Sequence, residues 1–182
     1  MKLNNTVRTT LIAASLALIS GSVFAAPVTI PVAVTFDGVV RDDTCATTVV
    51  GTGGTVDLGI ISNGSFSGAG STGPEKNFNI QLSGCGAGLA STLDVWFGGA
   101  NDDTATSSLK NMTGSANIGV QVLPVGGTAL VPNNAASTAS FTGLVAGAPN
   151  TLTLTARTVQ VGATTPTAGN LSVPGTLNIV YP

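Results

Sequence analysis

The chain has 182 residues, of which 43% are hydrophobic and 8% are charged, with a formal net charge of −2 and no histidine. A weakly acidic chain without clustered cations argues against nucleic acid or an anionic membrane as a partner. The lack of histidine excludes a Ser-His-Asp triad and every His-ligated metal site, so we expect no enzyme, cofactor or metal centre.

Residues 1–25 have the organisation of a secretory signal peptide. Lys2 and Arg8 precede an apolar run over residues 11–19, and Val23 and Ala25 occupy the positions that a signal peptidase recognises. The run is too short to span a bilayer, and no later run is longer. We expect export with Ala26 as the mature N-terminus; the alternative is an uncleaved buried helix.

A long alternating segment follows at residues 28–40. One face holds a row of apolar side chains that ends in a glycine: Val28, Ile30, Val32, Val34, Phe36 and Gly38. At about 3.3 Å per residue the segment reaches about 43 Å, which is long for one strand of a small domain. Pro31 lacks an N–H group and therefore favours an edge position. The segment is either an ordinary first strand, completing its own domain in cis, or a strand that completes another molecule.

Cys45 and Cys85 are the two cysteines of the chain. In an exported protein two thiols most simply form a disulfide; the alternative is two free buried thiols. Closing a loop of about 40 residues would stabilise the fold by about 4 kcal/mol in the chain-entropy model.

Short alternating segments and turn-rich stretches continue to the end of the chain, which is typical of an all-β protein. Strands are expected at residues 28–40, 55–61, 77–82, 93–97, 118–123, 151–157 and 176–181, with turns at 62–74 and 132–140 and no helix after residue 26. This number of strands in one domain predicts a β-sandwich. The expected core faces are Phe78, Ile80 and Leu82; Leu93, Val95 and Phe97; Ile118, Val120 and Val122; and Leu152 and Leu154.

The C-terminal segment alternates up to the last residue, with Leu177, Ile179 and Tyr181 on one face before Pro182. A sandwich of this class would normally be closed by one further strand. The sequence therefore predicts an open sheet edge and an apolar groove beside it. A surplus strand at one end and a missing strand at the other suggest that copies of the chain complete one another.

Other motifs have simpler explanations than a functional site. Residues 107–110 match S-x-x-K, but the companion motifs are absent. The acidic pairs at residues 42–43 and 102–103 raise the possibility of calcium, although solvated loop carboxylates are the commoner case. The glycine runs at 51–54 and 126–127, and the Asn63-Gly64 pair, indicate turns and not phosphate loops.

Five segments in order resemble the fimbrial subunits of the chaperone–usher pathway, the type 1 pilin family. They are residues 36–40 leading to Cys45, the spacing of Cys45 and Cys85, residues 78–85 (FNIQLSGC), residues 118–122 (IGVQV), and residues 177–181 with a penultimate Tyr. The resemblance covers essentially the whole mature chain. It implies an incomplete immunoglobulin-like sandwich lacking its last strand, which a donated strand completes.

The resemblance also implies roles and partners. Residues 26–40 would be a donor extension on a pilin domain at 41–182, with the even side chains of residues 28–36 filling a neighbour's groove and Gly38 at a shallow pocket. Leu177, Ile179 and Tyr181 would line the acceptor strand, and the Pro182 carboxylate would bind basic residues of a periplasmic chaperone. An outer-membrane usher would then exchange strands to build a homopolymer at the cell surface, supporting adhesion.

One alternative stays open within this class, and another is excluded by length. A minor adaptor or tip-proximal pilin with a direct binding role would carry the same motifs. A tip adhesin would need a lectin domain ahead of the pilin domain, for which 157 mature residues leave no room. The terminal Pro182 and Pro31 depart from the pattern of the family.

Overall fold

The computed structural model describes residues 41–182; the expected signal peptide and the segment at residues 28–40 lie outside this range. The elements are β1 (Ala46–Val49), η1 (Thr52–Gly54), η2 (Asn63–Ser65), β2 (Thr72–Ser83), β3 (Thr92–Gly98), β4 (Asp102–Asp103), β5 (Ser108–Lys110), β6 (Ile118–Pro124), β7 (Ala139–Thr142), β8 (Asn150–Gln160) and β9 (Thr176–Val180). The described residues include no helix long and apolar enough to cross a membrane.

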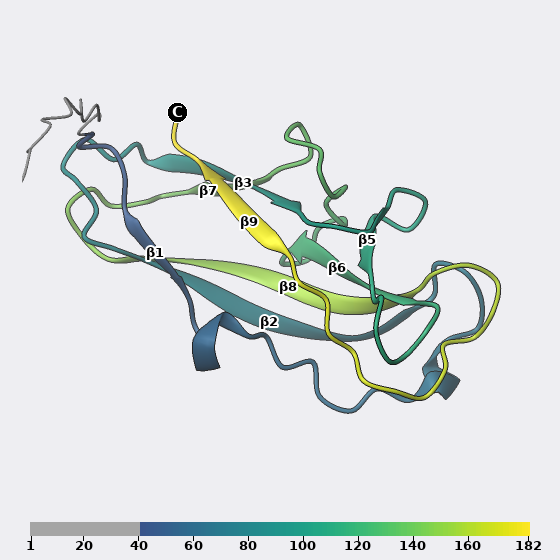
Figure 1. Cartoon of the computed structure of the whole chain (residues 1–182). Coiled ribbons are helices and arrows are strands. Elements are labelled where there is room, and N and C mark those ends of the chain that lie inside the picture. Colours follow the sequence, from purple (N-terminus) through teal and green to yellow (C-terminus); the bar gives the residue numbers. More distant parts are fainter. Residues whose placement is uncertain (1–40) are drawn as a thin grey trace, which may run out of the picture. The chain divides into compact units, whose positions relative to one another are not determined.

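The strands form two antiparallel sheets that face each other. A six-stranded sheet has the order β1-β2-β8-β6-β5-β4, and a three-stranded sheet has the order β7-β3-β9. Figure 1 shows β3, β7 and β9 as one layer and β2, β8 and β6 as the other, with β1 at the rim. The all-β sandwich that the sequence predicts is therefore confirmed for the described part of the chain.

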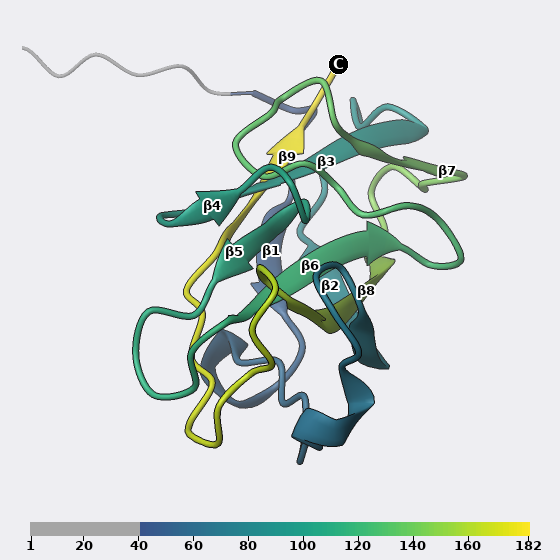
Figure 2. The same cartoon turned by 90° about the vertical axis from the view of Figure 1, so that its right-hand side faces the viewer.

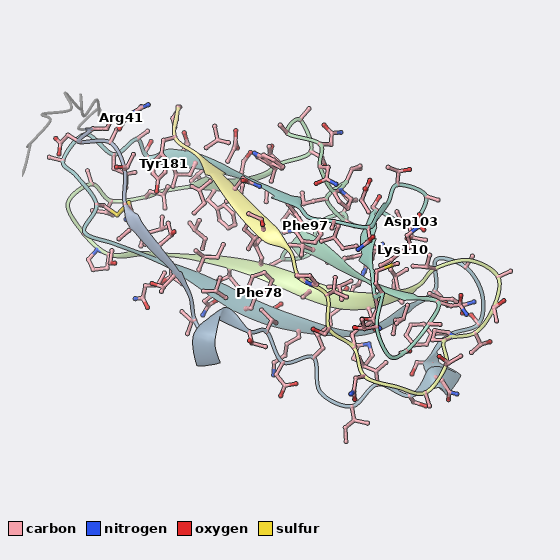
Figure 3. The ribbon with its side chains drawn as sticks, viewed as in Figure 1. Arg41, Phe78, Phe97, Asp103, Lys110 and Tyr181 are labelled. Atoms are coloured by element: carbon pink, nitrogen blue, oxygen red, sulfur yellow. A yellow bond between two sulfur atoms is a disulfide. The ribbon has the colours of Figure 1, made fainter. Side chains whose placement is uncertain are left out.

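The core lies between the two layers and is built from the faces that strand alternation predicts. Phe78, Ile80 and Leu82 of β2 and Leu152 and Leu154 of β8 are buried, as are the predicted residues of β3. In Figure 3 the Phe78 and Phe97 side chains, from opposite layers, project into the space between them. Side chains of a strand point alternately to the two faces of its sheet, and a register shift of one residue would turn all of these apolar side chains toward solvent. The apolar face of each strand therefore specifies which residues enter the core.

The strand expected at residues 55–61 does not form. This segment pairs with no strand of the described chain, and Gly59 within it adopts a φ of 73°. Val56 and Leu58 are half-buried, whereas Ile60 is fully exposed. The alternation is real, but a strand also needs a hydrogen-bonding neighbour, and the described residues supply none here.

Four strands were not expected from the sequence, and two predicted turn regions are partly strand. β1, β4, β5 and β7 have only two to four residues, too few for a visible alternation. β7 begins inside the stretch 132–140 that the sequence assigns to a turn, and β2 begins at Thr72, inside the predicted turn at 62–74. A register shift between Thr72 and Glu75 accommodates Gly73 and Pro74 in that strand.

The disulfide between Cys45 and Cys85 is present, as predicted. It joins the residue before β1 to the residue two positions after β2, the strand with which β1 pairs. Beside it, the N–H of Gly86 donates to the carbonyl of Thr44 at 3.2 Å. The bond therefore fixes the first described strand, which otherwise holds only four residue pairs, at the rim of the sandwich.

Candidate functional site

The site is the open edge formed by β9. This strand is the last member of the three-stranded sheet, pairs only with β3 among the described strands, and carries Val180 at 43% exposure on its outer face. Its odd-numbered side chains, Leu177 and Ile179, pack partly buried against the core, as does Tyr181. The acceptor strand predicted from the sequence thus lies at an unpaired edge of the described domain.

The pairing pattern shows which backbone groups of β9 face the open edge. In an antiparallel ladder the N–H and C=O of one residue point to the same side of the strand. The C=O of Phe97 accepts from Asn133 N–H at 2.9 Å, and Phe97 stands opposite Leu177. Phe97 therefore bonds away from β9, and the backbone groups of Leu177 and Ile179 point away from β3 toward the open edge.

A groove runs beside this edge, with a cavity volume of about 1290 Å³. Ile179, Leu177 and residues 166–175 form one wall, and residues 47–49 of β1 with residues 54–63 form the other. The floor is mainly apolar: Phe78, Ile80, Phe97, Ile118, Val120, Val122 and Ala156. An apolar channel of this size beside unpaired backbone groups has the shape and chemistry of a site for an extended peptide.

Tyr181 fastens the C-terminal end of β9, two positions beyond Ile179 of the groove wall. Its hydroxyl accepts from Cys45 N–H at 3.2 Å, across 136 positions of sequence. Figure 3 places Tyr181 and Arg41 at the same end of the sandwich. The C-terminal strand is thus attached directly beside the disulfide.

The segment before β9 is held by the side chain of Asn111, which is 7% exposed. Its amide nitrogen donates to the carbonyls of Thr113, Ser115 and Asn170 at 2.6, 2.7 and 3.1 Å. Its amide oxygen accepts from Ser172 N–H at 3.0 Å. One buried side chain therefore fastens the segment before β9, which forms a wall of the groove, to the turn between β5 and β6.

The charged residues of the described chain stabilise loops and strands. Arg41, which is exposed, donates to the half-buried Asp43, and this hydrogen bond is the main cause that lowers the pKa of Asp43 and raises that of Arg41. Asp103 accepts from the N–H groups of Ala105 and Thr106. The described residues contain no cluster of His, Cys, Asp or Glu that would hold a metal ion. Asp43 and Asp103 thus have structural roles, the first as the partner of Arg41 and the second as the acceptor for the turn that follows β4.

The S-x-x-K match also has a structural explanation. Ser108 is fully buried and its hydroxyl lies 2.7 Å from that of Thr106, while the Lys110 ammonium lies 4.0 Å from Asp103. Figure 3 shows Asp103 and Lys110 together near β5. Ser108 pairs in the ladder with Asp103 and has no solvent access. These residues hold β4 and β5 together.

Three parts of the site were not identified from the sequence. The wall formed by Val56 and Leu58 was assigned to an ordinary strand, the wall at residues 166–175 has no alternation, and Asn111 stands alone in a loop. The predicted residues Leu177 and Ile179 line the groove, Tyr181 packs partly buried against the core, and Pro182 follows it, exposed. The predicted donor residues, from Val28 to Gly38, lie outside the described range.

Comparison with known proteins identifies the family. The family model "Fimbrial protein" matches residues 34–181. The type-1 fimbrial protein A chain of Salmonella typhi is 34% identical over 86% of this chain and 89% of its own length. The corresponding A chain of Escherichia coli is 35% identical over 74% of this chain and 75% of its own.

Solved structures show the same fold at lower identity. The P pilus rod subunit PapA is 22% identical and superimposes with a TM-score of 0.58, covering 82% of this chain and 99% of its own. A subunit from the structure of a chaperone–usher pilus is 23% identical, with a TM-score of 0.58, covering 86% of this chain and all of its own. The chain thus belongs to the fimbrial protein family, as a non-enzymatic structural subunit of bacterial surface fimbriae with an incomplete immunoglobulin-like fold.

Proposed function

We propose that this subunit polymerises by strand donation: residues 28–36 of one copy add to the open edge of β9 in the next copy and fill its groove. The observation that carries the proposal is the apolar groove beside β9, toward which Leu177 and Ile179 direct their side chains and at whose open edge their backbone groups point. A donated strand would thus gain backbone bonds to Leu177 and Ile179, and burial of those of its side chains that face the groove.

The length of the groove matches the length of the predicted donor. Ile80 at one end of the floor pairs with Leu152 of β8, and Ile118 at the other end pairs with Gln160. The floor therefore spans eight residue steps of β8, about 26 Å at about 3.3 Å per step. Residues 28–36 also span eight steps, so their five apolar side chains fit the floor from one end to the other.

The expected free energy supports a durable contact. Burying Val28, Ile30, Val32, Val34 and Phe36 contributes about 1.5–3 kcal/mol for each side chain, about 7–15 kcal/mol together as an upper estimate. Ordering a flexible segment offsets part of this gain. The balance favours slow dissociation, which a surface fibre under shear requires.

A free groove and edge would aggregate, so a temporary occupant is needed before assembly. We infer that a periplasmic chaperone supplies a strand to β9 and binds the carboxylate of Pro182, and that an outer-membrane usher exchanges this strand for the next subunit's extension. Gly38 would then lie at the shallow end of the groove. The relatives named as A chains and type 1 subunits favour a homopolymeric rod component supporting adhesion, with a minor adaptor as the alternative.

The test uses an acceptor lacking residues 28–36 and a labelled peptide of residues 26–40. The wild-type acceptor should take up the peptide, and Ile179→Lys should prevent uptake because it places a charge in the groove. Val180→Lys is the matched control, since its side chain points to the opposite face of β9 and is 43% exposed. Fluorescence anisotropy of the peptide measures uptake by the wild-type acceptor and by each variant.

Changes in the peptide provide a second arm that leaves the folded domain untouched. Val32→Asp should abolish uptake because this side chain faces the groove, whereas Ala33→Asp should be tolerated. Equal uptake of both peptides would contradict the proposal. A full mature chain that stays monomeric at high concentration, and whose groove excludes the peptide, would show instead that the extension pairs within its own domain.

A further inference from the structure

The Asn63-Gly64 pair lies in an exposed turn, as the sequence predicts. It is the one Asn followed by Gly in the 182 residues of the chain. Both residues belong to η2, none of whose residues is buried, and Ser62 precedes them as the N-cap. Figure 2 shows η2 as a short coiled ribbon at the lower end of the view, beyond the ends of the strands. Solvent therefore has free access to the pair.

Asn followed by Gly can react spontaneously, because glycine has no side chain to obstruct the approach of its nitrogen. The backbone nitrogen of Gly64 attacks the side-chain carbonyl carbon of Asn63, its proton passes to solvent, and the side-chain nitrogen leaves as ammonia. Water then opens the resulting succinimide ring at either carbonyl, which gives aspartate or isoaspartate. The reaction consumes one water and releases one ammonia, so it needs no co-reactant other than water.

The fold does not require glycine at position 64. The φ of Gly64 lies outside the left-handed region that favours glycine, and an added Cβ would meet only the hydroxyl oxygen of Ser62, at 3.5 Å. This distance is an ordinary van der Waals contact, so alanine would fit the turn. The geometry of the turn therefore does not explain why the reactive residue is present, and Gly64→Ala provides a matched control.

The side chain of Ser62 controls the reacting nitrogen. Its hydroxyl oxygen accepts from Gly64 N–H at 3.3 Å, a long hydrogen bond between exposed groups. The nitrogen must leave this bond, and the turn must open, before the ring can close. Opening costs little free energy, because residues 55–65 pair with no strand of the described chain and η2 buries none of its residues. Ser62 therefore slows the reaction in the folded domain without preventing it.

The same turn holds part of the groove wall in place. The carbonyl of Asn63 accepts from Phe66 N–H at 3.2 Å. Phe66 is 6% exposed, and both residues line the groove. Isoaspartate would add a methylene to the backbone at position 63 and move this carbonyl away from Phe66, and both products would add a carboxylate to the wall.

We propose that Asn63 is a site of spontaneous conversion to aspartate and isoaspartate, controlled by Ser62, and that conversion distorts the groove wall at Phe66 and lowers the uptake of a donor segment. The effect on uptake rests on the proposed function. A subunit whose groove stays unfilled would thus lose its capacity to accept a strand with time.

The modification is tested on the mature chain, incubated in mildly alkaline buffer. Mass spectrometry of the proteolytic fragment that contains residue 63 measures the conversion, and chromatography separates the isoaspartate form. The wild type should convert, and Gly64→Ala should stay largely unconverted. Ser62→Ala should convert faster by up to roughly tenfold, the factor that one net hydrogen bond supplies. Ser65→Ala is the matched control and should behave as wild type, because the hydroxyl that holds Gly64 N–H is that of Ser62.

Conversion of Gly64→Ala at the wild-type rate, or equal rates for Ser62→Ala and Ser65→Ala, would overturn the assignment of the modification site. The effect on the groove is measured with the acceptor lacking residues 28–36 and the labelled peptide of residues 26–40. Converted acceptor should take up less peptide than fresh acceptor, in proportion to the converted fraction, whereas Gly64→Ala should keep its uptake over the same incubation. Equal uptake by converted and fresh acceptor would overturn the effect on the groove. Failure of fresh wild-type acceptor to bind peptide would instead refute strand donation, while mass spectrometry would still decide the modification.

Discussion

Asn111→Ala tests whether one buried amide holds the groove wall that precedes β9. The amide nitrogen has two hydrogens, so it can fully satisfy only two of its three carbonyl partners, while the amide oxygen accepts from Ser172 N–H. The substitution therefore removes the equivalent of three hydrogen bonds. At a net 0.5–1.5 kcal/mol for each, the free energy of unfolding should fall by about 1.5–4.5 kcal/mol.

Urea denaturation of the disulfide-bonded subunit, followed by circular dichroism, measures this loss. The matched control is Asn79→Ala, because Asn79 lies on the exposed face of β2 and its side chain makes one bond, accepting from Thr153 at 2.9 Å. The control should change stability by about 1 kcal/mol or less. Equal effects of the two substitutions, or peptide uptake unchanged in rate by Asn111→Ala, would refute the role assigned to this side chain.

Three other changes have expected outcomes of stated size. Cys45→Ser should lower the free energy of unfolding by about 4 kcal/mol in the chain-entropy model, and reduction of the wild type should give the same shift in urea midpoint. Tyr181→Phe should lower the free energy of unfolding by about 0.5–1.5 kcal/mol because it removes the hydrogen bond with Cys45 N–H; unchanged stability would show that this bond does not form in solution. Leu154→Ala should cost about 2–5 kcal/mol in thermal unfolding because the side chain is fully buried, whereas Val125→Ala should change stability by less than about 0.5 kcal/mol.

Strand alternation predicted most of the long strands and, at the site, the edge strand β9, but not the rest of the groove wall. The core faces of β2 and β3, the pair Leu152 and Leu154 of β8, and the edge residues Leu177 and Ile179 follow from a period of two. The prediction for β6 is only partly right, because this strand is buried on both faces: Val120 of the predicted face is half-buried, whereas Leu123 of the other face is 2% exposed. Two cysteines in an exported chain likewise sufficed to predict the disulfide. These features depend on residues close together in sequence, or on residue types with few alternatives.

The parts that were wrong or missed depend on long-range neighbours. Residues 55–61 alternate like a strand, but alternation does not reveal whether a partner strand lies alongside. Asn111 fastens Ser172 across 61 positions, and no local pattern marks such a contact. β4 and β5 exist because Asp103 and Ser108 face each other, although neither segment has enough residues to show a period.

The outward-facing backbone groups of Leu177 and Ile179 have a consequence for the length of the fibre. Backbone N–H and C=O groups are the same in every protein. In the proposed contact, Leu177 and Ile179 would therefore form the same hydrogen bonds with a donor segment that belongs to a subunit as with a free peptide. A free peptide of residues 26–40 would therefore act as a chain stopper. Growth would end at each subunit that captured one, and mean fibre length would follow the molar ratio of subunits to stoppers, as in a step polymerisation with a monofunctional additive.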